Sequence, residues 1–453
     1  MCDNQNVPSH EGFNRAEWVA FVEKMNITDV NVIDMLNNTR PEAKEEFLTA
    51  HELSRPNNVY AQLDIKRVEK NINTIIALKK ELGSLRIPKK QKEIALLILG
   101  DNLKKNRFVH VNYLYNHSSP NNREVLAQEH YRANIDLYGK PDENVFWSIL
   151  GEKLSAIPVG DLSKEDKIMY GELIEMIGPV QKAESKIFRP QKETVDWFSF
   201  VIQTFFTGFL SHIPKGQKKF SIAEACAITN EIISSEFGLG SETGLGADSW
   251  MAMVISSGAV ASTDCEQKLI RFPGQRSRGD YTREELKAII IHELGVHMLR
   301  SLPYEACKIQ SLAFGFPGYE AFEEGVAKAA EQAINHRYED SGLLHYISIG
   351  LAYFLRKNFR EVFEIQHRIE HLTKGEPDGR CFDSVQRAFR GTDELPNHKD
   401  LIYYNGVNEV WKYIEDHLND ADLMDQLFLS GKTCMNDKIH ERIIYAVRTG
   451  EYF

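Results

Sequence analysis

Apolar residues recur with the period of an α-helix through most of the first 185 residues. The clearest stretch is residues 61–82, where the apolar positions fall about 3.6 residues apart; they are Leu63, Ile65, Val68, Ile72, Ile75, Ile76 and Leu78. Similar patterns predict helices over Lys89–Leu103, Val125–Leu137, Glu143–Leu154 and Lys164–Ile177. Upstream, three shorter helical patterns are broken by Asn- and Pro-containing joints: Arg15–Lys24, Asp29–Asn37 and Pro41–Leu53. We therefore expect a mainly helical N-terminal region.

The pattern changes in the second half of the chain. The aromatic-rich segment Thr194–Phe209 fits a strand or a buried helix, because periodicity does not separate the two in such a run. Met251–Ile255 and Lys268–Phe272 predict two strands separated by a polar turn. Residues 282–285, Thr-Arg-Glu-Glu, then form a capping box that starts a helix. The expected fold class is α+β, mainly helical, with a small sheet just before the capped helix.

Breaks in the pattern suggest three domains. Arg55-Pro56-Asn57-Asn58 separates the short N-terminal helices from the longer ones, and the regular helical periodicity gives way near residue 185. We expect a helical appendage over residues 1–55, a helical subdomain over 56–185, and a third domain over 186–453 that holds the strands and the capped helix.

Composition narrows the functional classes. A chain of 453 residues with 42% apolar content can bury one large or two ordinary cores. Its net charge of −11 gives no indication of nucleic-acid binding, which normally requires a basic face. No signal peptide is visible, and the longest apolar run, Ile94–Gly100, is too short to cross a bilayer. The six cysteines are dispersed without a C-x-x-C pair, so we expect reduced thiols and a cytoplasmic location.

The capped helix carries two histidines and a carboxylate on an apolar background: Ile289–Leu299 reads IIIHELGVHML. Zinc peptidases often use H-E-x-x-H, where the histidines lie four residues apart on one helix face. Here His292 and His297 lie five apart, and five residues of an ideal α-helix turn about 500°, which leaves the rings roughly 140° apart. A π-bulge absorbs one extra residue and occurs mostly at functional sites. We predict such a bulge, with Gly295 as the position that tolerates it.

A third zinc ligand is expected on a second helix. Residues 315–327 read GFPGYEAFEEGVA, a Pro/Gly turn leading into a helix with two adjacent carboxylates, Glu323 and Glu324. Alone, such a pair is more typical of a solvated helix face. Beside the histidines it completes a zinc site, because two His, one Glu and one open position form a catalytic arrangement.

Four motifs follow one another in the second half of the chain. They are HELGVH at residues 292–297, GFPGYEAFEEGVA at 315–327, RAFRGT at 387–392 and KDLIYYNG at 399–406. In this order they resemble the tubulin tyrosine carboxypeptidase family, the microtubule-associated tyrosine carboxypeptidases of animals and their bacterial relatives. The family pattern is approximately HEIGTH or HEIGVH, GLPGYxxTQEGLA, RxFRGT and FTKDxxYLxG. The chain departs from it mildly, with Val326 in place of Leu and Asn397-His398 in place of Phe-Thr.

The resemblance implies a role for each matched residue. His292 and His297 match the zinc histidines, Glu324 the third ligand and Glu293 the catalytic base. Glu323 falls where relatives often carry Gln, which favours Glu324 as the ligand.

The same residues suggest a mechanism of peptide cleavage. Zinc makes a water molecule nucleophilic, while Glu293 takes its proton and passes it to the leaving amine. The oxyanion needs a second donor besides the metal. Tyr403 aligns with the family tyrosine and is the preferred donor, with Tyr404 and His398 as the other candidates.

A carboxypeptidase also needs a cation for the substrate's free C-terminus. The family-matched motifs offer Arg387, Arg390 and Lys399, for which surface salt bridging is an equally good explanation. The expected function is a zinc-dependent metallocarboxypeptidase that removes a C-terminal Tyr or Phe from a protein or peptide. Tubulin tails are one such substrate class, although an acidic chain gains no steering toward acidic tails unless its basic residues cluster. A zinc endopeptidase or aminopeptidase, and a catalytically idle metal-containing binding module, are the open alternatives; the oligomeric state is not predicted.

Overall fold

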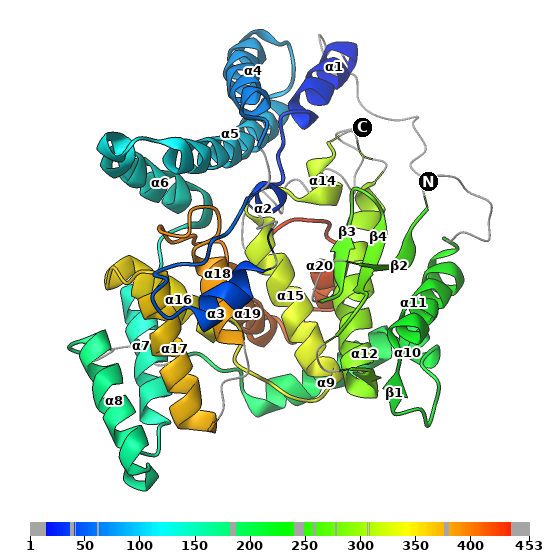
Figure 1. The fold of residues 1–453 in the computed structure, drawn as a ribbon. Helices are drawn as coiled ribbons and strands as arrows, with labels where there is room; N and C mark the ends of the chain where they lie inside the picture. The colour runs from blue at the N-terminus through cyan, green and yellow to red at the C-terminus, as the bar shows by residue number, and fades with distance from the viewer. Residues whose placement is uncertain are drawn as a thin grey trace. The chain divides into compact units, whose positions relative to one another are not determined.

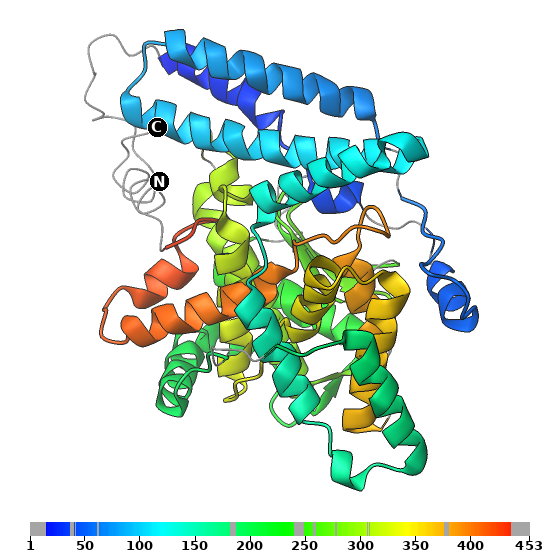
Figure 2. The same cartoon turned by 90° about the vertical axis from the view of Figure 1, so that its left-hand side faces the viewer.

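The computed structural model divides into two compact units. The residues it describes are 15–36, 40, 42–60, 63–181, 187–239, 249–256, 260–276, 279–305, 307, 309–375 and 380–435. We call residues 189–341 and 405–435 the sheet unit, and residues 15–188 and 342–404 the helical unit. Figures 1 and 2 show many helices and a few short strands. The predicted class, mainly helical α+β with small sheets before the histidine helix, is confirmed.

The helical unit consists mostly of α-helices. Their bounds, with two 3-10 turns, are α1 (Arg15–Asn26), α2 (Val32–Met35), α3 (Ala43–Thr49), α4 (Ile65–Ser84), α5 (Lys89–His117), η1 (Pro120–Asn122), α6 (Arg123–Tyr138), α7 (Glu143–Ser155), η2 (Val159–Asp161), α8 (Lys164–Ile177), α16 (Leu343–Phe354), α17 (Phe359–Lys374) and α18 (Arg380–Ala388). All the helices predicted before residue 185 are present, and α8 has the predicted bounds.

Helix α5 is longer than the apolar pattern predicts. It begins at Lys89 as expected but continues to His117, over 29 residues, alongside α4 (Figure 2). Beyond Leu99 its buried face includes Asn102, Asn106 and Asn112. These amides find partners, and Asn106 Nδ2 donates to the Thr28 carbonyl at 2.9 Å. Because three of the six buried positions beyond Leu99 are asparagines, the apolar periodicity that predicts the helix weakens before the helix ends.

The core of the helical unit lies around α7 and α16–α18. Phe146 of α7 is fully buried, and α16 approaches it closely at Gly350, where an added Cβ would lie 2.0 Å from the ring. Phe47 of α3 packs against Phe359 and Phe363 of α17, with ring centroids 5.0 and 5.4 Å apart. Helix α3, from the predicted appendage, therefore shares this core. The three predicted domain boundaries stay predictions. Part of the predicted appendage, including residues 1–14, lies outside the described residues.

The sheet unit combines short strands with helices. Its elements are α9 (Lys192–Phe205), α10 (Thr207–Ser211), β1 (Lys219–Phe220), α11 (Ile222–Phe237), β2 (Met251–Ile255), β3 (Ser262–Asp264), β4 (Leu269–Pro273), β5 (Tyr281–Thr282), α12 (Arg283–Ile290), the π-helix η4 (Ile291–Met298), α13 (Leu299–Ser301), η5 (Leu302–Tyr304), α14 (Ser311–Phe314), α15 (Tyr319–Ile334), residues 405–416 of α19 (Leu401–Asp416), and α20 (Leu423–Phe428). The ambiguous aromatic segment is thus helical, in α9 and α10.

Two small sheets precede the histidine helix; one has three strands and is mixed, and the other has two antiparallel strands. In the three-stranded sheet, β4 lies between β2 and β3 (Figure 1), pairing parallel with β2 and antiparallel with β3. Both predicted strands are confirmed as β2 and β4, while β3 comes from the intervening polar segment. In the second sheet, β1 pairs antiparallel with β5, whose Thr282 leads directly into α12. The sheets therefore fix where the histidine helix begins.

Candidate metal centre

The helix that carries the histidines is capped as predicted. The Thr282 side chain accepts a hydrogen bond from the Glu285 amide at 3.1 Å, and the Glu285 carboxylate accepts one from the Thr282 amide at 2.9 Å. Helix α12 then continues without interruption into the π-helix η4. In a π-helix each amide bonds to the carbonyl five residues earlier, and the wider turn brings residues five apart toward the same face of the helix. The predicted π distortion between His292 and His297 is confirmed.

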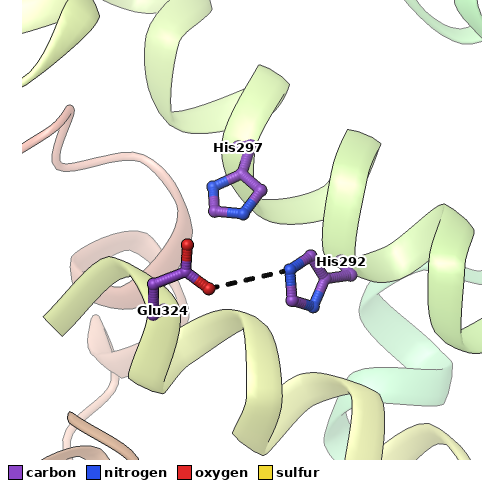
Figure 3. Close-up of side chains that lie close together, drawn as sticks. All are labelled: His292, His297 and Glu324. Atoms are coloured by element: carbon purple, nitrogen blue, oxygen red, sulfur yellow. Dashed lines mark ion pairs between the residues drawn. The ribbon is translucent and has the colours of Figure 1, made fainter. Parts of the chain in front are cut away.

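His292, His297 and Glu324 converge on one point (Figure 3). One ligand-type atom from each lies within 4.8 Å of the others, and His292 Nε2 is 3.9 Å from Glu324 Oε2. Zinc with ligands about 2.1 Å away in a tetrahedral arrangement would hold them about 3.4 Å apart, so a small inward movement closes the set. The side chains are 14–23% exposed, which leaves room for a fourth ligand from solvent. Two imidazoles and one carboxylate match a catalytic zinc site.

Glu293 lies beside this set without belonging to it. Its residue is 5% exposed, and its Oε2 accepts a hydrogen bond from Thr263 Oγ1 of β3 at 2.7 Å. The same hydroxyl lies 3.1 Å from the Glu293 carbonyl oxygen. Strand β3 therefore holds this carboxylate next to the candidate metal ligands.

A second carboxylate orients His292 from behind. Glu331, two turns along α15 from Glu324, accepts a hydrogen bond from His292 Nδ1 at 3.3 Å and pairs with Lys328 at 2.7 Å. Burial opposes ionisation of Glu331, but His292 and Lys328 bring its pKa down to about 2. Because a carboxylate can only accept here, Nδ1 carries the proton and Nε2 is available to a metal.

Glu323 plays the corresponding part for His297. His297 Nδ1 donates to Glu323 Oε1 at 2.8 Å, and the same carboxylate pairs with Arg300 and Lys432. Burial would raise the pKa of Glu323, but Lys432, His297 and Arg300 hold it well below its usual range. Sequence reasoning weighed Glu323 only as a rival ligand and missed this supporting role. Adjacent positions on a helix point about 100° apart, which is the signal that only one of Glu323 and Glu324 can face the ion.

The other predicted site residues, Arg387, Arg390, Lys399 and Tyr403, belong to the helical unit. Arg387 makes a bidentate pair with the buried Asp400, at 2.6 and 2.9 Å, and its guanidinium lies 4.9 Å from the centre of the Tyr403 ring. Burial alone would raise the pKa of Asp400, but Arg387 and Arg390 hold it well below its usual range. Lys399 is 8% exposed. Arg387 is therefore already committed to an internal carboxylate.

The two alternative oxyanion donors are also in the helical unit and are buried. His398 has no exposed surface, and its Nδ1 donates to the Gly139 carbonyl at 2.8 Å. Tyr404 is 7% exposed and packs on Tyr346, with ring centroids 5.1 Å apart. A donor to a substrate needs an accessible polar atom, so the burial of His398 argues against that role.

The site combines two converging histidines on one helix, a carboxylate from a second helix and an acid next to the first histidine. This combination defines the class of metallopeptidases. Residues 251–443 match the family model described as microtubule-associated tyrosine carboxypeptidase. This part of the chain is a domain of that family, and by family and site the protein is a metallocarboxypeptidase. Searches of curated proteins and of solved structures found no match.

Proposed function

We propose that the protein is a zinc-dependent carboxypeptidase that removes a C-terminal tyrosine or phenylalanine from a protein or peptide. The observation that carries the proposal is the convergence of His292, His297 and Glu324 beside Glu293, inside the family domain. The aromatic preference is taken from the family's description, which names tyrosine.

The donor set supports zinc as the ion. His292, His297 and Glu324 would hold it, leaving one position open, and carboxylates behind both imidazoles favour the tautomer that binds metal. When bound, zinc makes water nucleophilic at neutral pH and polarises a carbonyl oxygen. Burial would lower the pKa of His292, but Glu331, Glu293 and Glu324 raise it above its usual value, so the site attracts positive charge.

Glu293 would serve as general base and then general acid. Its carboxylate is held by Thr263 next to the ligand set, where it takes the proton of the attacking water. It then delivers that proton to the amine of the departing residue. Strand β3 is one edge of its sheet, and an extended peptide that adds to this edge would pass beside Thr263 and the base.

Recognition of the free C-terminus is proposed for the cations of the matched motifs. Arg387 and Arg390 both lower the pKa of Asp400, so the two guanidinium groups lie near the same carboxylate. Because Arg387 already binds Asp400 through two hydrogen bonds, we assign the substrate carboxylate to Arg390, with Lys399 of the next motif as the second proposed cation. Tyr403, stacked on Arg387, is the proposed oxyanion donor.

The substrate is proposed to be a chain with a free C-terminus, met in the cytoplasm. The described cysteines form no disulfide: Cys226, Cys265, Cys307, Cys381 and Cys434. None of the described helices combines the length and apolarity needed to cross a bilayer. The family's description names association with microtubules, which makes tubulin tails a candidate within this substrate class. A net charge of −11 means that local basic residues, rather than overall charge, would have to attract them.

Peptides that differ only in the chemistry of their N-terminus or C-terminus test the proposal. Substrates ending in Tyr or Phe should lose one residue, seen by mass spectrometry. Amidation of the C-terminus should slow this by roughly 10- to 100-fold, because it removes a charged hydrogen bond of about 1.5–3 kcal/mol. N-acetylation should have no effect. Internal cuts, or equal rates on free and amidated peptides, would identify an endopeptidase, and sensitivity to N-acetylation an aminopeptidase.

A further inference from the structure

Behind His297, the sheet unit buries three charged side chains in contact with one another. Glu323 is 1% exposed, Arg300 0% and Lys432 3%. Arg300 Nε donates to Glu323 Oε2 at 2.9 Å, while the Lys432 ammonium donates to Oε1. Oε1 also accepts from His297 Nδ1 at 2.8 Å. Both oxygens of Glu323 are therefore engaged, and one of them joins Lys432 directly to a candidate metal ligand.

Stability alone does not explain this cluster. Removing charges from water is costly, and a buried ion pair is often no more stable than apolar side chains of similar size. Two cations for one carboxylate make the arrangement less favourable still, because one positive charge is left without a local partner among these three residues. The geometry instead has a consequence for His297, whose Nδ1 proton can point only at Glu323.

Lys432 reaches this position through a short segment that we call the strap, residues 429–433. The strap is tied by backbone hydrogen bonds from Lys432 N to the Leu312 carbonyl at 3.1 Å and from Phe316 N to the Lys432 carbonyl at 2.9 Å. Arg300 Nη2 donates to the Thr433 carbonyl at 2.8 Å, so the same arginine holds both the strap and Glu323.

The turn of the strap requires glycine. Gly431 has a φ of +77°, and an added Cβ would lie 2.6 Å from the Tyr304 ring. Ser430 and Thr433 on either side have no exposed surface. The strap is thus a buried, closely fitted segment whose placement determines where the Lys432 ammonium lies.

We propose that Lys432 is a positioning residue for the metal centre, and that docking of the strap and metal binding at His297 are thermodynamically linked. Lys432 holds Glu323 in the rotamer that accepts from His297 Nδ1, and this presents Nε2 to the ion. Linkage is reciprocal, so a metal that favours the oriented His297 also favours the docked strap. The inference rests on the proposed function, since it requires the metal site.

Metal affinity of three variants tests the linkage. Zn²⁺ dissociation constants are measured by competition with a chromophoric chelator. Lys432→Met should raise the constant by about 10- to 100-fold, the usual effect of removing an outer partner of a ligand. Glu323→Gln should raise it at least as much, because it also leaves Arg300 and Lys432 buried without the carboxylate that they contact. The double variant removes one cation with the anion, so its affinity should be better than that of Glu323→Gln alone.

The matched control is Lys374→Met in the helical unit. Lys374 also pairs with a buried glutamate, Glu370, which is 2% exposed. It contacts no candidate ligand, so the Zn²⁺ constant should not change. Strictly additive effects of the Lys432 and Glu323 substitutions, or a wild-type constant in Lys432→Met, would overturn the proposal.

Hydrogen exchange of the unmodified protein gives a second readout that needs no variant to fold. Amides of residues 429–433 should exchange more slowly with Zn²⁺ than with chelator, while those of α17 should be unaffected. Equal exchange of the strap in both conditions would refute the linkage. If wild-type protein binds no Zn²⁺ at all, the proposed function fails; if it binds Zn²⁺ and the strap and Lys432→Met do not respond, only this inference fails.

Discussion

Four glutamates around the metal centre take different parts because of their neighbours. Glu324 faces the two histidines, and Glu293 is held aside by Thr263. Glu323 and Glu331 each support one imidazole from behind. The same side-chain chemistry is therefore proposed to supply a ligand, a base and two orienting groups, and a substitution at each should have a different signature.

Glu293→Gln provides the sharpest contrast at the scale of one residue. The amide still accepts from Thr263 and does not alter the ligand set, so the variant should fold and retain about one zinc per chain. It cannot take a proton, and turnover should fall at least ~100-fold. Elemental analysis checks that zinc is retained, and peptide-cleavage rates check that turnover falls. His292→Ala is the control that loses metal. Near-normal turnover would remove Glu293 from the mechanism.

At the scale of an element, the π-helix η4 depends on close packing at Gly295. An added Cβ would lie 3.0 Å from the Phe206 ring, which is 2% exposed and packed against Phe209 and Phe428. The ring has little room to move, so overpacking in Gly295→Ala should destabilise the protein by about 1–3 kcal/mol. This cost outweighs the ~1 kcal/mol that alanine gains over glycine in helix propensity. The free energy of unfolding measures the sum.

Gly171→Ala in α8 is the matched control for this prediction. Gly171 is exposed, and an added Cβ there would meet nothing within 4 Å. Only the helix propensity changes, so the variant should be more stable by about 0.5–1 kcal/mol. Destabilisation by Gly171→Ala, or stabilisation by Gly295→Ala, would contradict the account of η4.

At the scale of the whole molecule, acid should weaken the fold through buried histidines of the helical unit. His130 and His398 have no exposed surface, and neither nitrogen of His130 has a hydrogen-bond partner among the described residues. Burial lowers the pKa of His130 to about 3 and that of His398 to about 4. In the unfolded chain the histidine pKa is near 6.5. At pH values between the folded and unfolded pKa values, the unfolded chain therefore binds more protons than the folded protein. The contribution of these neutral histidines to the free energy of unfolding is therefore fully present above about pH 6.5 and is lost as the pH falls toward 4.

Urea midpoints at pH 7.5 and 5.5, measured with chelator present so that metal loss does not contribute, test this dependence. The midpoint should fall at pH 5.5. His130→Leu should reduce the difference, since an apolar side chain suits that site at either pH. His51→Leu, at an exposed position, should not. An unchanged difference in His130→Leu would show that another group is responsible.

The sequence alone determined what depends on neighbours along the chain. Periodicity predicted the helices up to residue 185, the Thr282 capping box located the start of α12, and the five-residue spacing of the histidines required the π-helix. In each case the deciding interactions join residues a few positions apart. Helix α5 marks the limit, because its buried asparagines find partners as distant as Thr28.

Only the tertiary structure decided what surrounds each carboxylate. The contact between Glu323 and Lys432 spans 109 positions of the chain, and that between Thr263 and Glu293 joins a strand to a helix. No local pattern encodes such pairs, since the role proposed for each glutamate follows from its burial and from the position of its partner, rather than from its residue type. Long-range packing thus gave the four glutamates the different surroundings on which their proposed roles rest.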